Sequence, residues 1–278
     1  MKKKNVYVVT HKPFDDKFIK NDSAYSVIKV GNKLEDSFVE KKKWLNDSSG
    51  ENISSKNPYY CETTAQYWAW KNVEDVEISG LCHYRRFFLD PFEKKSVHIL
   101  RRESIEKILA KNEVILLHPT VKSIDAIIPK KNIPLSIQEE NFSVIREILL
   151  NDYPECVEAY DSMIYGKKMI WRNMFITHKE LFDRYSAFLF DVLSKYDKKM
   201  AEKSYVRRPR IDGFEAEYLL PTWFLTYCKN IFFAECIDPK DIGVTSFFRR
   251  KLLFNDHTVY NLTFRLKERI RKLKDRGR

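Results

Sequence analysis

Strand-like apolar runs alternate with helix-like segments along most of this chain. The runs at 5–10 (NVYVVT), 76–82 (VEISGLC) and 231–236 (IFFAEC) are rich in β-branched and aromatic residues and have the length of strands. Helical periodicity separates them, as in ESIEKILAK at 103–111. This alternation favours one α/β domain over residues 1–245, with a mostly parallel central sheet flanked by helices. Further strands are expected at 113–118, 125–129 and 171–177, and further helices at 139–151, 154–164 and 214–227.

Local signals place several helix boundaries and loops. Asn57 precedes a proline, which predicts an N-cap and a helix over 58–72. The T-x-x-E sequence at 177–180 is a capping box and predicts a helix through residue 196. The polar segments at 40–56 and 198–210 are predicted loops.

The net charge of +11 is concentrated near the end of the chain. Residues 249–278 contain eleven Lys and Arg against three acidic residues, so this segment carries +8 and the rest only +3. Apolar residues recur there at spacings of three and four, which predicts a basic amphipathic helix in a tail at 246–278. Such a helix docks on the body, lies on an anionic membrane or binds nucleic acid. The apolar positions are Val259, Leu262, Leu266, Ile270 and Leu273.

The cysteine content and hydropathy favour a reducing compartment. Five cysteines, with no C-x-x-C pair, indicate neither a disulfide framework nor a zinc site. No run approaches the roughly 18 apolar residues of a membrane span, and no signal-peptide apolar region follows the basic start. We therefore expect a cytoplasmic protein whose contact with a membrane is peripheral.

Several common catalytic motifs are absent from the sequence. There is no Gly-rich phosphate loop, no G-x-S-x-G and no H-E-x-x-H. These absences disfavour the kinase, hydrolase and metalloprotease classes.

The HYRR sequence at 83–86 follows a predicted buried strand. Ligands of open α/β sheets bind beyond the carboxyl ends of the strands, where Arg85 and Arg86 offer guanidinium groups suited to phosphate. The alternative for these arginines is an internal ion pair with Asp90 or Glu93. His83 is either a ligand contact or a structural histidine. His11 and Lys12 end the first strand and would face the same edge of the sheet, although ordinary loop polarity also explains them.

Two carboxylates follow Gly213, in GFEAEYLL. The glycine is expected to break the chain before the helix, which would place Glu215 and Glu217 in its first turn. A carboxylate there either stabilises the helix through its dipole or acts as a general base toward an acceptor hydroxyl.

Six segments together resemble successive blocks of a bacterial glycosyltransferase family from capsule, exopolysaccharide and O-antigen loci. The family was first described as a domain of unknown function. Characterised members have a GT-A-type fold and transfer galactofuranose from UDP-galactofuranose. The resemblance covers roughly residues 5–235, and the segments are VYVVTHKPF, GENISSKNPYYCETTAQYWAWKN, GLCHYRRFF, NDYPECVEAYD, NMFITHKELFDRYSAFLFDVL and GFEAEYLL.

The resemblance also implies how the leaving group is stabilised. Most GT-A enzymes hold a divalent metal with an Asp-x-Asp motif at the end of a central strand, and this chain has no such motif. Its comparable strand ends in His83, Tyr84, Arg85 and Arg86. The implied reaction is metal-independent and needs no cofactor, because the two arginines stabilise the departing UDP.

The same resemblance assigns roles to individual residues. Glu217 would be the base of an inverting transfer, with Glu215 and Asp212 behind it. Asn173 would lie beside donor and acceptor. The other implied donor-binding residues are Thr10, His11, Lys12, Asn57, Tyr60, Glu62, His83 and Tyr84.

The implied partners are a UDP-sugar donor and a lipid-linked oligosaccharide acceptor. The basic tail would then hold the enzyme at the anionic inner face of the cell membrane. Two alternatives stay open: a transferase for another UDP-sugar, and a non-enzymatic basic module for RNA or phosphorylated ligands. The near-neutral body disfavours a nucleic-acid partner.

Overall fold

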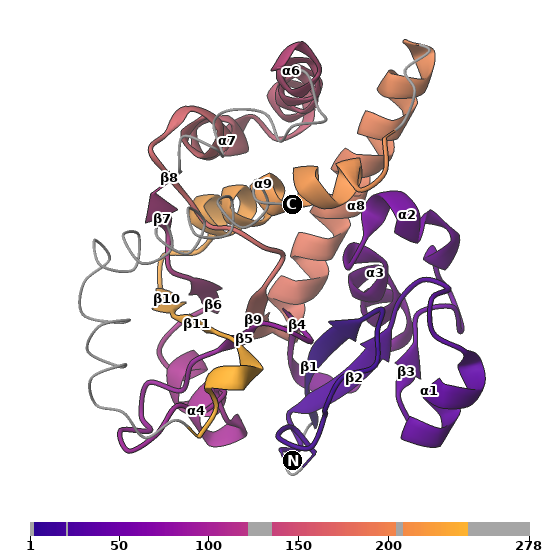
Figure 1. Cartoon of the computed structure of the whole chain (residues 1–278). Coiled ribbons are helices and arrows are strands. Elements are labelled where there is room, and N and C mark those ends of the chain that lie inside the picture. The colour runs from indigo at the N-terminus through magenta and orange to yellow at the C-terminus, as the bar shows by residue number, and fades with distance from the viewer. Residues whose placement is uncertain (1–2, 21, 122–134, 204–207, 244–278) are drawn as a thin grey trace, which may run out of the picture.

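A computed structural model of the chain describes residues 3–20, 22–121, 135–203 and 208–243 (Figure 1). The central sheet contains β1 (Lys3–Thr10), β2 (Tyr25–Lys29), β3 (Leu45–Asn46), β4 (Val76–His83), β6 (Val114–Leu117), β9 (Phe175–His178) and β10 (Ile231–Ala234). Their order is β10-β6-β9-β4-β1-β2-β3. β9 pairs antiparallel with β4 and β6, whereas the other neighbouring pairs are parallel. The predicted mostly parallel α/β sheet is confirmed.

Two short antiparallel pairs accompany this sheet. β5 (Phe87–Phe88) pairs with β11 (Cys236–Ile237), and β7 (Thr120–Val121) pairs with β8 (Lys168–Met169). The first pair holds the segment after β4 against the segment after β10. Leu89 N–H adds a hydrogen bond to the Glu235 carbonyl at 2.9 Å.

Helices flank the sheet and form an additional outer layer. α8 packs against β4 and β9, and α4 packs against β6 and β9. In Figure 1, α6 and α7 lie beyond α8 and α9, farther from the sheet. The helices are α1 (Asp36–Lys42), α2 (Asn57–Tyr60), α3 (Thr63–Asn72), α4 (Arg102–Leu109), α6 (Leu135–Asp152), α7 (Val157–Tyr165), α8 (Lys179–Glu202) and α9 (Ile211–Tyr227), with 3-10 turns at Ser54–Lys56, Pro154–Cys156 and Pro239–Asp241.

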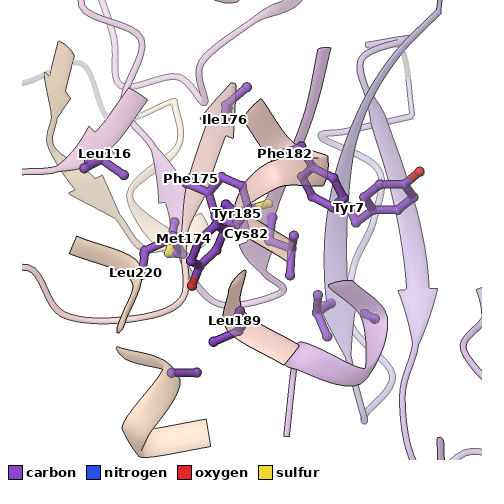
Figure 2. Packing of buried hydrophobic residues seen from close by; sticks show 14 of the residues in the cluster. Tyr7, Cys82, Leu116, Met174, Phe175, Ile176, Phe182, Tyr185, Leu189 and Leu220 are labelled. Carbon is purple, nitrogen blue, oxygen red and sulfur yellow. The ribbon is translucent and has the colours of Figure 1, made fainter. Parts of the chain in front are cut away.

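Aromatic rings fill the core between β9 and the helices (Figure 2). The Phe175 ring lies 5.6 Å from Phe182, 5.3 Å from Tyr185 and 5.4 Å from Phe224, measured between centroids. Successive strand residues point to opposite faces, and Phe175 and Ile176 are both fully buried. Both faces of β9 are therefore covered.

Gly80 permits an unusually close approach of β4 to β9. A Cβ at this position would lie 2.3 Å from the Phe175 carbonyl oxygen, a backbone atom that cannot move aside alone. The glycine in the middle of β4 therefore serves strand packing next to the site described below.

The predicted helix over 58–72 is two helices. Cys61 has a positive φ of 53°, which ends α2 after Tyr60 and redirects the chain into α3. The side chain of Asn57 does not cap the N-terminus of α2; its amide donates instead to the Cys61 carbonyl at 2.8 Å. Asn57 therefore satisfies the end of the short helix, so its predicted N-cap role is wrong.

Other predicted boundaries also differ from the structure. Thr177 belongs to β9, where its Oγ1 donates to the Glu113 carbonyl at 2.6 Å, so the predicted capping box does not form. Gly213 is the third residue of α9 rather than a break before it, which moves Glu215 and Glu217 beyond the first turn. The predicted loops at 40–56 and 198–210 contain the end of α1, β3 and the last turn of α8.

The remaining predictions concern membrane-spanning helices and two segments of the chain. Among the described residues, none of the helices combines the length and apolarity needed to cross a bilayer. The predicted tail helix at 246–278 and the predicted strand at 125–129 lie outside the described residues.

Candidate functional site

The carboxyl ends of β1, β2 and β4 meet at one edge of the sheet. Tyr84 N–H donates to the Val9 carbonyl at 3.1 Å, and Val30 N–H donates to the Thr10 carbonyl at 2.9 Å. These bonds extend the parallel pairing past the strand ends. The predicted placement of the HYRR sequence beside the end of the first strand is correct, and this edge is where open α/β sheets bind ligands.

A tight turn after β1 presents His11 and Lys12. Thr10 is buried, and its Oγ1 donates to the Lys12 carbonyl at 2.6 Å and accepts the Lys12 N–H at 3.1 Å. The His11 and Tyr84 rings are nearly perpendicular, with centroids 5.6 Å apart. The hydroxyl of Thr10 therefore fixes the turn, and Tyr84 fixes the imidazole.

Four cationic side chains lie close enough to His11 to act on it electrostatically. Burial lowers the pKa of His11 below its usual value, and four positive charges lower it further. All four side chains are exposed, and they come from the turns after β1, β2 and β4 and from the residue before α9. We call them the cationic cluster: Lys12, Lys33, Arg85 and Arg210.

Arg86 points to a different partner. One of its terminal nitrogens (Nη1) lies 2.8 Å from Oδ2 of Asp238 and donates to the Arg85 carbonyl at 2.6 Å. The ion pair with Asp90 or Glu93 considered from the sequence does not form, because Arg86 pairs with Asp238. Asp90 and Glu93 pair with Arg101, at 3.5 and 3.1 Å.

Behind the cationic cluster lie His83, Glu62 and Asn173, which we call the buried polar cluster. Asn173 Nδ2 donates to Glu62 Oε1 at 2.8 Å and to the Gly213 carbonyl at 3.1 Å. His83 Nε2 lies 4.0 Å from the same Glu62 oxygen. Burial raises the pKa of Glu62 and lowers that of His83 to about 4, so the imidazole is neutral at pH 7.

Glu217 borders this cluster from α9. Its Oε2 accepts the Arg172 N–H at 3.2 Å, and Arg172 adopts a positive φ of 74° just before Asn173. The side chain is half-buried, and its charge acts on His83, whose pKa it raises against the larger effect of burial. Glu217 therefore keeps access to solvent while its carboxylate is oriented by a backbone donor.

Cys61 lies near members of both clusters: Glu62 of the buried polar cluster and Arg210 of the cationic cluster. Burial raises the pKa of its thiol to about 11, with the charges of Glu62 and Glu217 adding to this and that of Arg210 opposing it. A Cβ on Gly213 would lie 3.0 Å from the Cys61 sulfur, so α9 rests directly on the corner between α2 and α3. The carboxyl side and the cationic side of the site thus meet at this corner.

Asp212 and Glu215 are placed deeper than Glu217. Their exposed fractions are 0% and 2%. Burial, and then the charge of Asp212, raise the pKa of Glu215 to about 8. Both carboxyls are buried, with Glu215 near Tyr160 of α7, and neither offers an accessible base.

Two residues predicted to line the donor site point elsewhere. The Tyr60 hydroxyl donates to Asp197 on α8 at 2.9 Å, and its ring stacks on Phe190. The Asn57 amide binds within the α2–α3 corner, at the Cys61 carbonyl and, at 3.1 Å, the Thr64 hydroxyl. The structure gives Tyr60 and Asn57 contacts that support the site from behind.

The sequence did not identify four residues of the site: Lys33, Cys61, Arg172 and Arg210. Each lies in a turn or at a helix end, so no periodicity marks it. Cys61, Arg172 and Arg210 share an unusual positive φ, at 53°, 74° and 67°, which non-glycine residues rarely adopt and which no sequence pattern signals. Lys33 follows Gly31, whose φ of 66° marks a tight turn.

In the described ranges, no group of three or more His, Cys, Asp or Glu side chains is arranged to hold a metal ion. The site is instead built from fixed cations on one side and carboxyl groups on the other.

Comparisons with known proteins concern the fold and the family. A search of curated proteins found no match. Among solved structures, the chain is similar to WbbM, described as a bifunctional glycosyltransferase in its apo form, with a TM-score of 0.65 and 20% identity. The match covers 88% of this chain and 46% of that one, and it shows a shared glycosyltransferase-like fold. Residues 5–229 match the family model described as a domain of unknown function, DUF4422. The chain therefore belongs to the DUF4422 family.

Proposed function

We propose that this protein is an inverting galactofuranosyltransferase. It would transfer galactofuranose from UDP-galactofuranose to a lipid-linked oligosaccharide in capsule, exopolysaccharide or O-antigen synthesis. One observation carries the proposal: Arg210 of the cationic cluster and the oriented carboxylate of Glu217 both act on Cys61, while Lys12 and Arg85 of the same cluster follow the carboxyl ends of β1 and β4.

The cationic cluster suits the leaving group of a nucleotide-sugar donor. Charge builds on UDP as the sugar bond breaks, and fixed cations stabilise it without a metal ion or other cofactor. Arg85 is exposed beside His11, whereas the guanidinium of Arg86 is held by Asp238. We therefore assign leaving-group stabilisation to Arg85 and a supporting role to Arg86.

Glu217 suits the acceptor side of the reaction. An inverting displacement requires a base that removes the proton of the attacking hydroxyl on the face opposite the leaving group. Of the three carboxyls on α9 considered from the sequence, Glu217 alone is not fully buried. Its Oε2 accepts the Arg172 N–H, and this contact orients the carboxylate that would receive the proton of the hydroxyl.

The turn after β1 suits the nucleoside. His11 and Tyr84 form an aromatic edge beside the cationic cluster, and the Thr10 hydroxyl fixes the backbone at Lys12. In the proposed complex the base and ribose lie against this turn, and Glu62, His83 and Asn173 form the floor under the sugar.

The proposed donor sugar and acceptor are based on similarity to other proteins rather than on the geometry of the site. The likeness to WbbM, described as a bifunctional glycosyltransferase, supports sugar transfer, and the sequence blocks shared with galactofuranosyltransferases support the donor.

The basic tail at 246–278 suits an anionic membrane surface, where a lipid-linked acceptor resides. Deleting residues 256–278 should release the protein from anionic vesicles, and unchanged vesicle binding would rule out this role of the tail.

A thermal-shift comparison tests the proposed function. The full chain is heated with UDP, UDP-galactofuranose, UDP-glucose, ADP and an RNA oligomer, because only a ligand of the folded state raises Tm. We expect UDP species to raise Tm and ADP and RNA to leave it unchanged. Stabilisation by RNA alone would support a binding module instead, and preference for UDP-glucose would support another donor.

A further inference from the structure

Arg210 occupies a fixed place between α2 and α9. Its N–H donates to the Pro58 carbonyl at 2.8 Å, and its own carbonyl accepts the Phe214 N–H at 3.1 Å. The guanidinium carbon lies 5.1 Å from the centre of the Phe214 ring. Its φ of 67° is a left-handed conformation that side chains with a Cβ rarely adopt, and such residues concentrate at functional sites.

Lys33 is held by the same short helix. A Cβ on Gly31 would lie 2.5 Å from the Asn57 side-chain oxygen, so the turn that carries Lys33 closes directly on the start of α2. Because Pro58 binds Arg210 and Asn57 packs on Gly31, α2 sets the positions of both cations relative to the ends of β1 and β2.

The four members of the cationic cluster lack carboxylate partners. Over the described ranges of the chain, no Asp or Glu oxygen lies within 4.0 Å of a charged nitrogen of Lys12, Lys33, Arg85 or Arg210. Neighbouring Arg86, by contrast, has Asp238. Glu62 attracts Arg210 only from beyond ion-pair distance. Like charges gathered without a salt-bridged carboxylate repel one another, and a bound anion reduces that repulsion.

The anion affinity comes from the side chains rather than from the end of the helix. The first turn of α9 contains the buried carboxyl Asp212, whose negative charge opposes the attraction of a helix N-terminus for anions. The guanidinium of Arg210 instead offers several donors in a planar fork, a geometry that matches phosphate oxygens.

We propose that Arg210 and Lys33 bind the diphosphate of the nucleotide donor together with Lys12 and Arg85, and that Arg210 thereby positions Glu217 for the reaction. This inference rests on the proposed function. Arg210 directly precedes α9, and Glu217 is the seventh residue of that helix, two turns away. A contact between diphosphate and Arg210 would fix the start of α9 against the α2–α3 corner, and Glu217 with it. Lys33 belongs to a different segment and would contribute affinity alone.

The test separates affinity from positioning. Calorimetry measures the Kd of UDP and of uridine for the full chain and for Arg210→Ala, Lys33→Ala and Arg184→Ala. Arg184 is the matched control, because it lies over Trp223 near the opposite end of α9, at 5.7 Å from the ring. We expect the first two variants to weaken UDP about tenfold, with uridine affinity unchanged, and Arg184→Ala to match the wild type.

Kinetics then test the effect on Glu217. With UDP release from the donor as the readout, Lys33→Ala should raise KM at constant kcat, whereas Arg210→Ala should raise KM and lower kcat at saturating donor. Arg210→Lys, which keeps the charge, should recover most of the affinity and confirms that a loss is not misfolding. Wild-type protein that does not bind UDP would overturn the proposed function itself. UDP binding that is equal in the wild type and Arg210→Ala would overturn only this inference, and an unchanged kcat in Arg210→Ala would overturn the positioning role.

Discussion

Nε2 of His83 lies 4.0 Å from Oε1 of Glu62, at the floor of the candidate site. Burial depresses the pKa of the histidine to about 4 and raises that of the carboxyl, so burial disfavours the charged form of each. The site therefore combines a weakly charged floor with the cationic cluster, and this contrast leads to predictions on pH-dependent stability and on donor binding.

The neutral state of His83 should make the fold sensitive to acid. The unfolded histidine takes up a proton near pH 6.5, whereas the folded one does so only near pH 4. The free energy of unfolding should thus fall as the pH drops from about 6.5 to about 4, by up to about 1.4 kcal/mol per pH unit from this group. Urea denaturation across this range should show a shallower decline in His83→Asn than in the wild type. His98→Asn serves as control, and equal slopes for all three proteins would contradict the assignment.

Glu215 should give a pH dependence of opposite sign. Its carboxyl loses a proton near pH 4.5 in the unfolded chain but only near pH 8 in the folded protein. Its contribution to the free energy of unfolding is therefore largest at low pH and declines as the pH rises from about 4.5 to about 8. Glu215→Gln should remove this decline, so its stability relative to the wild type should increase toward pH 8. Parallel stability curves for the two proteins would show that Glu215 ionises normally.

Replacing Glu217 with glutamine should abolish most turnover without loss of donor binding. A general base typically contributes about 10²–10⁴-fold to the rate, and the amide keeps the size of the side chain. We expect kcat to fall within that range while the Kd for UDP and Tm stay near wild type. Glu158→Gln, an exposed position on α7, is the control. Near-normal turnover of Glu217→Gln would remove this residue from the mechanism.

The two adjacent arginines should differ in their effect on the donor. Arg85 is exposed at the strand end, whereas Arg86 is bound to Asp238 at 2.8 Å. Arg85→Ala should weaken UDP about tenfold or more, and Arg86→Ala should weaken it less while lowering Tm through the lost link to the segment after β10. Titration calorimetry and thermal melts distinguish the two; a larger affinity loss in Arg86→Ala would reverse the assignment.

Chelation should leave the activity intact. The proposed reaction uses the fixed cations of the cationic cluster for the charge of departing UDP. Turnover measured after dialysis against EDTA should equal that of untreated enzyme, and added manganese should not raise it. Activity that disappears with EDTA and returns with manganese would show that a metal takes part.

The sequence was sufficient for five of the seven strands of the sheet and for the edge at which β1 and β4 end, but it did not predict β2 and β3. The apolar runs at β1 and β4 have the β-branched content and length of strands, and parallel strands place Thr10 and His83 at the same edge. Boundaries that depend on one backbone angle were not predictable: Cys61 splits a helix through a positive φ, and Gly213 continues one that it was expected to interrupt.

Side-chain partners were predicted less well than positions. Arg86 could have paired with any nearby carboxylate, and the partner that lies closest, Asp238, is 152 residues away in the sequence. Lys33 and Arg210 join the site only because α2 brings their segments together, a contact that no local pattern encodes. Long-range contacts of this kind are set by tertiary packing rather than by propensity.

The amide of Asn173 has a consequence for how the site forms. It joins Glu62, 111 residues away in sequence, to the carbonyl of Gly213, 40 residues away. Contacts between such distant residues form slowly, because the chain loses loop entropy before the contact compensates for it. The sheet edge of β1, β2 and β4 lies within the first third of the chain and can form during synthesis, but the floor of the site is completed only after α9 has left the ribosome.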